Sequence, residues 1–151
     1  MKTAPIISKH PGTFFGILIA LALTAYFLIM KAVGLVHIME LRLFNFVILF
    51  AGTALAMREH AKATEDHYNY FHTLGKGCAT VFVGVGLFSL FIFAYLNYDT
   101  QMLYMMKQNS IMGNFLTPYT AAIGVFGEGA SSGFIMSYIL LSYMKNQSQT
   151  T

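Results

Sequence analysis

Glu128 is the residue whose type and setting point most directly to chemistry, because it stands inside an apolar segment that runs from about Leu116 to Tyr143. A carboxylate in the middle of a bilayer costs roughly 2.5–3.5 kcal/mol on insertion scales, and such residues commonly serve a function. The neighbours that share its helix face at helical spacing are small or hydroxylated: Thr120, Ala121, Gly124, Ser131 and Ser132. This small, polar face is compatible with two settings for Glu128. Either Glu128 binds a proton or substrate in a wet crevice, or a neutral glutamic acid makes a structural hydrogen bond in a dry contact, since low dielectric favours the neutral form.

Glu40 and Arg42 form a second group of charges, near the start of another apolar segment. Two positions apart on a helix, they point to different faces and do not pair with each other. The long Arg42 side chain either extends to the membrane surface or reaches toward Glu128, because the two helices are expected to run in the same direction. If Arg42 and Glu128 pair, single substitutions should cost more than the double one, whereas simple additivity in a double-mutant cycle would refute the pair.

Metal-ligand residue types occur in two stretches between the apolar segments. The stretch 58–76 holds Glu59, His60, Glu65, Asp66, His67 and His72, and the stretch 98–115 holds Met102, Met105, Met106 and Met112. Carboxylates and imidazoles bind zinc, and thioethers bind Cu(I). The first stretch lacks the helical His–His and Glu–His spacings, and the methionines equally suit a segment that lies on the bilayer. We therefore expect no metal, haem or other cofactor.

Catalytic groups are not evident elsewhere in the sequence. No nucleophile has a nearby base, and no glycine-rich loop suits a phosphate. Cys78 is the only cysteine and sits in an apolar run, so we expect a buried thiol and no intrachain disulfide. These observations predict a protein that is not an enzyme and has no catalytic residues.

The composition shows which elements must position these residues. Apolar residues are 56% and charged residues 10% of the 151 residues, against about 45–50% and about 25% in a typical soluble domain. These values exclude a disordered chain, a soluble disulfide scaffold and most soluble enzymes, and they favour a multi-span membrane protein. The net charge is +3 without a dense basic cluster, so nucleic acid is not an expected partner.

Four apolar segments are expected to span the membrane, at about 12–30, 36–57, 77–97 and 116–143. The first exceeds the apolar length of a signal peptide and lacks a clean cleavage site, so we expect it to be retained. The uncharged part of the second segment, Leu43 to Met57, is too short to span the membrane alone, so the span must include Glu40 and Arg42. The segments do not alternate as barrel strands do. The predicted fold is all-α, a membrane protein with four transmembrane helices in an up-down-up-down bundle.

The distribution of basic residues predicts the orientation of this single domain, residues 1–151. Both termini and the polar loop 58–76 lie on one side, which carries Lys2, Lys9, Arg58, Lys62, Lys76 and Lys145; the other side, with the loop 98–115, carries Lys31, Arg42 and Lys107. The positive-inside rule places the first side in the cytoplasm. The tail 144–151 is polar and expected to fray.

Small residues recur at spacing four on the predicted helices, where lipid provides no hydrophobic drive for association. The residues expected at close helix contacts are Gly12, Gly16, Gly84, Gly129 and Gly133. Such faces serve either packing within the chain or the seam of a homo-oligomer. Besides the lipid bilayer, the possible partners are therefore a second copy or another membrane protein.

The layout resembles a bacterial family known as domain of unknown function 4199, over about residues 40 to 145. The likeness rests on a few polar marks within the hydropathy pattern: Arg58-Glu59-His60, Tyr70-Phe71-His72-Thr73-Leu74-Gly75-Lys76-Gly77, Tyr95-Leu96-Asn97-Tyr98, Gly129-Ala130-Ser131-Ser132-Gly133-Phe134-Ile135-Met136-Ser137 and Lys145. The family consists of four-span membrane proteins without an established activity. The resemblance therefore implies a multi-pass protein of the bacterial inner membrane and no mechanism.

Two functions agree with these observations. The first is a non-catalytic membrane protein that acts as scaffold, assembly factor or accessory subunit, which fits the lack of catalytic sets. The second is a small oligomeric transporter or channel that uses Glu128 as its proton or substrate site. Since four helices rarely enclose a path, transport would need a dimer or larger assembly. A polar cavity that reaches Glu128 favours the second function, and a dry, packed Glu128 favours the first.

Overall fold

The computed structural model of the chain describes residues 11–34, 43–63, 70–109 and 113–148. These residues are helical apart from short connections. The elements are α2 (Pro11–Ala32), α3 (Leu43–Ala63), α4 (Tyr70–Tyr98), α5 (Thr100–Asn109), the short 3-10 turn η2 (Gly113–Phe115) and α6 (Pro118–Ser148). The all-α class predicted from the sequence is confirmed.

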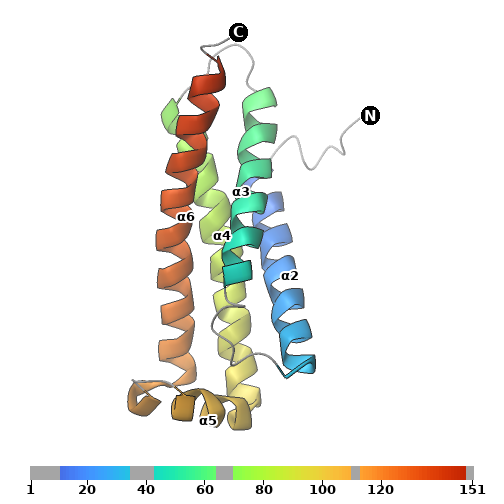
Figure 1. Cartoon of the computed structure of the whole chain (residues 1–151), viewed down its shortest axis with the longest axis vertical. Helices are drawn as coiled ribbons and strands as arrows, with labels where there is room; N and C mark the ends of the chain where they lie inside the picture. Colours follow the sequence, from blue (N-terminus) through green and yellow to red (C-terminus); the bar gives the residue numbers. More distant parts are fainter. Residues whose placement is uncertain (1–10, 35–42, 64–69, 110–112, 149–151) are drawn as a thin grey trace.

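The four long helices lie side by side and alternate in direction along the chain, while α5 lies across one end of the bundle (Figure 1). Helix α4 is the centre of the packing, because it contacts α6, α2 and α3, and α3 also contacts α2 and α6. We call the end that α5 crosses the α5 end. The opposite end, where α6 finishes, is the terminal end.

Three of the helices are long and apolar enough to cross a membrane: Gly12–Ala32, Thr73–Tyr98 and Pro118–Tyr143. The chain is therefore a candidate multi-pass membrane protein, but the predicted count of four spans is not confirmed. Helix α3 is the one that falls short. Its apolar part from Leu43 to Met57 extends about 22 Å as a helix, against about 30 Å of hydrocarbon.

The helices extend beyond the apolar segments that predicted them. Helix α3 continues to Ala63 and α4 begins at Tyr70, so both enter the predicted loop 58–76, and α6 continues to Ser148 in the predicted tail. Backbone hydrogen bonds continue a helix whether its side chains face lipid or water, so hydropathy marks the apolar part of a helix and not its end. The predicted start of the second span, at Val36, lies outside the described residues.

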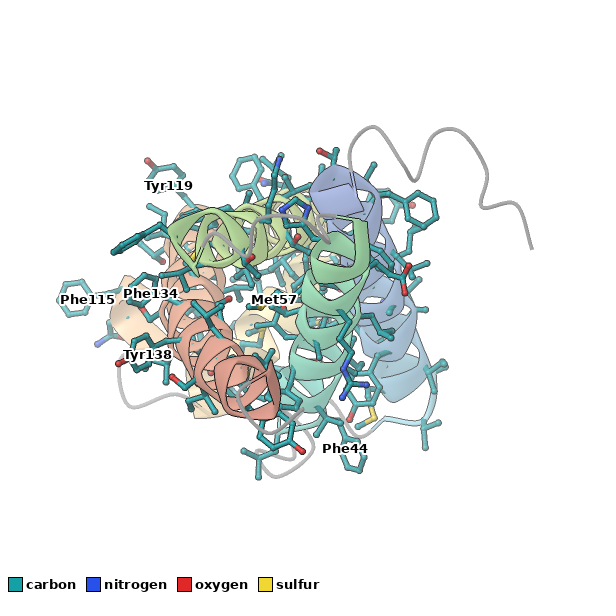
Figure 2. The ribbon with its side chains drawn as sticks, turned by 90° about the horizontal axis from the view of Figure 1, so that it is seen from above. Phe44, Met57, Phe115, Tyr119, Phe134 and Tyr138 are labelled. Carbon is teal, nitrogen blue, oxygen red and sulfur yellow. The ribbon has the colours of Figure 1, made fainter. Side chains whose placement is uncertain are left out.

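Large apolar side chains cover the outside of the bundle on every side (Figure 2), as the labelled Phe44, Phe134 and Tyr138 illustrate. Met57, in contrast, points inward and is fully buried. Soluble monomers rarely expose contiguous apolar patches larger than a few hundred Å². An apolar exterior around a packed interior is the arrangement expected in lipid.

A cap fixes the start of α6, the helix that carries Glu128. The Thr117 N–H donates to Thr120 Oγ1 at 2.7 Å, and the Thr120 N–H donates to Thr117 Oγ1 at 3.1 Å. Pro118, at the first helical position, lacks an N–H that would have no partner there. This reciprocal cap fits the sequence Thr-Pro-Tyr-Thr and sets the register of the helix. Glu128 follows Pro118 by ten residues, about 15 Å along the axis.

Glycines bring α2 into close contact with α4 in the terminal half of the bundle. A Cβ placed on Gly16 would lie 2.8 Å from Val83 and 2.9 Å from the Thr80 carbonyl oxygen, and one on Gly84 would lie 3.0 Å from the Gly16 carbonyl oxygen. A Cβ on Gly12 would lie 3.2 Å from Thr80 Oγ1. Only glycine allows the two backbones to approach this closely.

Two further glycines bring α6 against the opposite side of α4. A Cβ on Gly129 would lie 2.6 Å from Val85, and one on Gly133 would lie 2.2 Å from Val81. Both valines are buried, so each occupies the room left by the missing glycine side chain. We call these contacts of Gly12, Gly16, Gly84, Gly129 and Gly133 the glycine seam. These glycines therefore serve helix packing within the chain.

Candidate functional site

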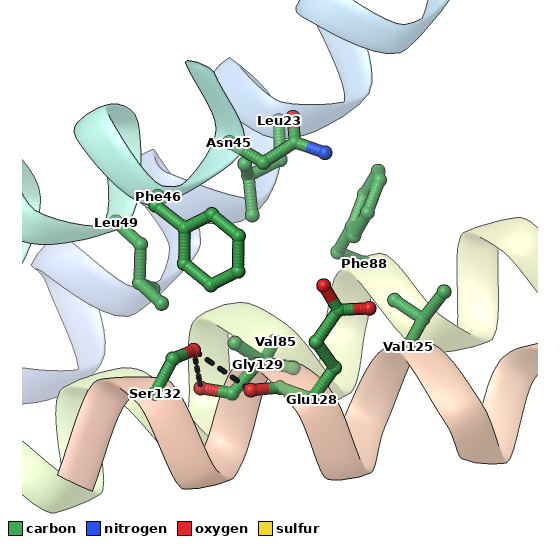
Figure 3. Close-up of a pocket in the computed structure, with 10 residues that line it drawn as sticks. All are labelled: Leu23, Asn45, Phe46, Leu49, Val85, Phe88, Val125, Glu128, Gly129 and Ser132. Carbon is green, nitrogen blue, oxygen red and sulfur yellow. Dashed lines mark hydrogen bonds between the residues drawn. The ribbon is translucent and has the colours of Figure 1, made fainter. Parts of the chain in front are cut away.

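Glu128 extends from α6 into the space between α6, α3 and α4 (Figure 3). Its carboxylate is turned toward Asn45 and Phe46 of α3 and toward Phe88 of α4. These residues line a small pocket of about 70 Å³, together with Leu23, Leu49, Val85, Val125, Gly129 and Ser132. An acidic group from one helix therefore faces an amide and two aromatic rings from two others.

A larger cavity of about 330 Å³ extends from Glu128 and Asn45 toward the α5 end. The two spaces share Asn45, Phe88, Val125 and Glu128 among their lining residues. The rest of the larger lining comes from α2, α4, α5, α6 and the connection before α6: Phe27, Ile92, Leu96, Met102, Met106, Leu116, Thr120, Ala121 and Gly124. Its volume falls at the lower end of the range for small-molecule sites, about 300–1,000 Å³.

Asn45 is the second polar group of this cavity, and the sequence did not predict it as a site residue. Its Oδ1 is buried and accepts no hydrogen bond. A buried amide oxygen without a donor costs about 1–3 kcal/mol, so such a group calls for an explanation. An asparagine inside an apolar helix could have been noticed, but its alignment with Glu128 depends on how α3 packs against α6.

The hydroxyl groups near Glu128 donate hydrogen bonds to backbone carbonyl oxygens. Ser132 Oγ donates to the Glu128 carbonyl oxygen at 2.7 Å, and Thr120 Oγ1 donates to the Phe115 carbonyl oxygen at 2.9 Å. A serine or threonine that bonds its own helix satisfies its donor without using water or a ligand. Glu128 and Asn45 are the other polar side chains among the residues that line the two spaces.

The structure brings together only some of the residues that the sequence selected. Ser132 lines the small pocket, whereas Ser131 is exposed and belongs to neither set of lining residues. Glu40 and Arg42 lie outside the described residues, so the pairing of Arg42 with Glu128 stays a prediction.

The methionines of α5 divide between two faces. Met102 and Met106 line the cavity, whereas Met105 is exposed, and Met112 lies outside the described residues. Helix α5 lies across the end of the bundle, as a segment on a membrane surface would (Figure 1). In the described part of the chain, no three His, Cys, Asp or Glu side chains are grouped to hold a metal ion.

Lys31 and Asp99 form an ion pair at the α5 end that the sequence analysis did not identify. Lys31 Nζ lies 2.7 Å from Asp99 Oδ2 and also donates to the Tyr95 hydroxyl. Asp99 Oδ1 accepts the Met102 N–H at 3.0 Å, which makes Asp99 the N-cap of α5. The Lys31 ammonium, and next to it the Met102 amide, hold the pKa of the Asp99 carboxyl below its ordinary value. An aspartate directly before a helix of this composition is a cap pattern that could have been recognised.

Fully buried side chains fill the terminal half of the bundle. They include Met57, Leu141 and Val81 and three hydroxyl residues, Thr53, Thr80 and Ser137. Each of these hydroxyls donates to a carbonyl oxygen of its own helix at 2.7–2.9 Å. Polar atoms in this half are thus satisfied locally, and the half is closely packed.

Comparison with known proteins gives no relative from which a role could be transferred. No family model matches the chain, and neither the curated proteins nor the solved structures contain a match. The resemblance to domain of unknown function 4199 therefore stays a prediction.

Proposed function

We propose that the protein is a four-span integral membrane protein without catalytic activity that acts as a small transporter or channel. Its proton or substrate site is the cavity at Glu128. The observation that carries this proposal is that the Glu128 carboxylate is turned toward Asn45 and Phe88 (Figure 3), and that these three residues also line a cavity of about 330 Å³. A scaffold would have no need to hold an acidic group beside an open space in the middle of a span. A transporter that binds a proton or substrate within the membrane would need such an arrangement.

The case for a fourth span rests on the outward face of α3. This face carries large exposed apolar side chains along most of the helix: Leu43, Phe44, Val47, Phe50 and Leu55. Helix α3 also packs against all three candidate spans. In water these side chains would form a costly exposed patch, whereas in lipid they continue the apolar exterior of the bundle. Arg58 and Glu59 would then lie at the membrane surface, near the terminal end.

The direction of access follows from the proposed orientation. Both termini and most basic residues would be cytoplasmic, in agreement with the positive-inside rule. The cavity would then open from Glu128 toward the outer side, where α5 lies. The close packing of the terminal half separates Glu128 from the cytoplasm. One copy in this conformation would bind from outside only, so release to the inside requires a second conformation or a larger assembly.

Carboxyl infrared difference spectroscopy in liposomes tests the proposal. The wild-type protein is compared with Glu128→Gln, which removes the Glu128 carboxyl and so identifies its band. We expect a band that titrates with the pH of the bulk solution, because the cavity admits water. A Glu128 band that stays protonated over the accessible pH range would mean a dry structural hydrogen bond. That result would overturn the proposal in favour of a scaffold or accessory role.

A further inference from the structure

We propose that the α5 end of the protein lies in the headgroup layer of one leaflet, where exposed aromatic side chains bind the lipid surface. The anchoring residues are Tyr98, Tyr104, Phe115 and Tyr119. The inference goes beyond the proposed function, because it concerns a different surface from the cavity at Glu128. It rests on that proposal only in requiring that the long helices cross the membrane.

The four aromatic side chains come from consecutive elements that meet at one end of the bundle (Figure 1). Tyr98 ends α4, Tyr104 lies in α5, Phe115 ends η2 and Tyr119 lies in the first turn of α6. Each side chain is between 62% and 92% exposed. Figure 2 shows that Phe115 extends away from the side of the bundle, where lipid would surround it. Tyrosine is enriched at the membrane surface because its ring is apolar and its hydroxyl is polar.

Exposed tyrosines mark a second level toward the terminal end. Tyr119 and Tyr138 lie on the same helix, α6, and are 19 residues apart, which is about 29 Å along the axis. The hydrocarbon core of a bilayer is about 30 Å thick. Among the side chains that the structure describes, no exposed tyrosine lies between these levels, and the large exposed apolar residues there are aliphatic or phenylalanine, such as Leu21, Leu90 and Phe82. The two tyrosine levels therefore match the two boundaries of the hydrocarbon.

The Lys31–Asp99 ion pair marks the same boundary independently of the aromatic residues. Lys31 lies in the last turn of α2, and Asp99 lies between Tyr98 and the start of α5. Lys31 Nζ is 2.7 Å from Asp99 Oδ2, and both side chains reach the surface. Charges are costly in hydrocarbon, whereas the long lysine side chain can hold its ammonium at the headgroups. The hydrocarbon should therefore end close to the level at which α5 begins.

The exposed face of α5 has the mixed composition expected in a headgroup layer. On the inner face, Met102 is buried and Met106 is half-buried. The exposed residues combine an aromatic ring and a thioether with three polar side chains: Tyr104, Met105, Gln101, Lys107 and Gln108. A helix with such a polar face lies in the plane of the membrane surface and not within the hydrocarbon. Helix α5 has this direction, because it crosses the end of the bundle (Figure 1).

Tryptophan fluorescence measures the depth of individual positions, because the chain has no tryptophan of its own. Tyr104→Trp and Phe115→Trp place the probe at the α5 end, and Tyr138→Trp places it at the other tyrosine level. Leu90→Trp is the matched control. Leu90 is 65% exposed but precedes Tyr98 on α4 by eight residues, about 12 Å along the axis.

Each variant is reconstituted in phosphatidylcholine vesicles that carry one of two quenchers, a nitroxide on the headgroup or bromine in the middle of the acyl chains. Iodide in the buffer reports exposure to water. We expect the headgroup nitroxide to quench Tyr104→Trp, Phe115→Trp and Tyr138→Trp more strongly than bromine does. The order should be reversed for Leu90→Trp. Unfolding in detergent verifies that each variant is folded, and Tyr98→Trp replaces Tyr104→Trp if the latter is not.

The outcomes separate this inference from the proposed function. Quenching of Tyr104→Trp and Phe115→Trp by iodide alone would place α5 in water, and quenching by none of the three agents would mean that protein covers this end. Either result would overturn the inference, while bromine quenching of Leu90→Trp would leave the membrane crossing intact. Quenching of Leu90→Trp by iodide, without quenching by lipid, would overturn both.

Discussion

The two halves of the bundle are built from the same helices but differ in how closely other side chains pack against their glycines. In the terminal half, buried valines of α4 pack against Gly129 and Gly133 of α6 and fill the space beside these glycines. Toward the α5 end of the same helix, Gly124 has no atom within 4 Å of the position of a Cβ and lines the cavity. A glycine at helical spacing therefore marks either a close contact or an open space, and the neighbouring helix decides which.

The position of α3 accounts for this difference among the described residues. Helix α3 contacts α2, α4 and α6, and it begins at Leu43, two residues before Asn45 of the cavity lining. In the terminal half, four helices thus contribute side chains to the interior. Toward the α5 end, α3 contributes only Asn45 to the described lining, and the rest comes from α2, α4, α6, the connection before α6, and α5, which lies across the end (Figure 1).

The largest effect on stability is expected from adding a side chain in the closely packed terminal half. Gly133→Ala should lower the free energy of unfolding by about 1–3 kcal/mol, because a buried, β-branched valine cannot easily move aside. Gly127→Ala, on the same helix, has no atom within 4 Å of its Cβ position, and it should be neutral or stabilise by about 0.5–1 kcal/mol. Thermal unfolding in detergent, followed by circular dichroism, compares the two. Equal losses in both would contradict the close contact of Gly133 with Val81.

A larger side chain in the cavity should keep water from Glu128 and leave folding nearly unchanged. Gly124→Leu places a side chain in the cavity without meeting a neighbour at its Cβ. We expect a smaller change of the Glu128 carboxyl band with bulk pH than in the wild type, because the leucine side chain displaces water from the cavity. The unfolding temperature should stay close to that of the wild type. A folded variant whose Glu128 band changes with pH as in the wild type would contradict the location of the site.

A smaller effect is expected from the hydrogen bond that joins α4 to α6. Ser89 Oγ donates to the Ala122 carbonyl oxygen at 2.7 Å and is buried. Ser89→Ala should lower the free energy of unfolding by about 0.6 kcal/mol, the average for such bonds between membrane helices. Ser142→Ala, which loses only a bond within its own helix, is the matched control. Titration with a denaturing detergent measures both, and a control that loses as much stability would contradict the role of the bond between helices.

The smallest effect is expected at the Lys31–Asp99 ion pair. Lys31 and the Met102 amide lower the pKa of Asp99 in the folded protein. The folded state therefore binds this proton less readily than the unfolded state. The resulting stabilisation is present above the ordinary aspartate pKa of about 3.9 and is lost as the pH falls through the lower folded value. The pair is exposed, so the contribution is small.

Asp99→Asn isolates that contribution, because asparagine retains the cap of α5. The variant should be slightly less stable than the wild type at neutral pH, and the difference should disappear in acid. Unfolding temperatures of both proteins, measured as the pH is lowered from about 7 to below about 3.9, give the comparison. A difference that is independent of pH would mean that the ion pair contributes nothing and that the substitution acts on the cap.

The sequence predicted the residues of one helix face better than it predicted their neighbours. Thr120, Ala121 and Gly124 were placed on the face of Glu128 by helical spacing, and all three line the larger cavity. Helical spacing is a local property, so it can be read without knowing the fold. Asn45 was missed because its importance depends on the register between α3 and α6. Asp99 was missed although its cap position is local to the sequence.

By itself, the amino-acid sequence determined that the chain forms long apolar helices, since composition and the absence of strand alternation depend on local chemistry alone. It also selected the glycines at which helices approach and the carboxylate that stands within a span. Only the tertiary structure decided which glycines are filled, that Asn45 faces Glu128 across a cavity, and that α3 is apolar on its outward face. These properties depend on the position and register of neighbouring helices. That arrangement follows from packing over the whole bundle, which no single segment of the sequence specifies.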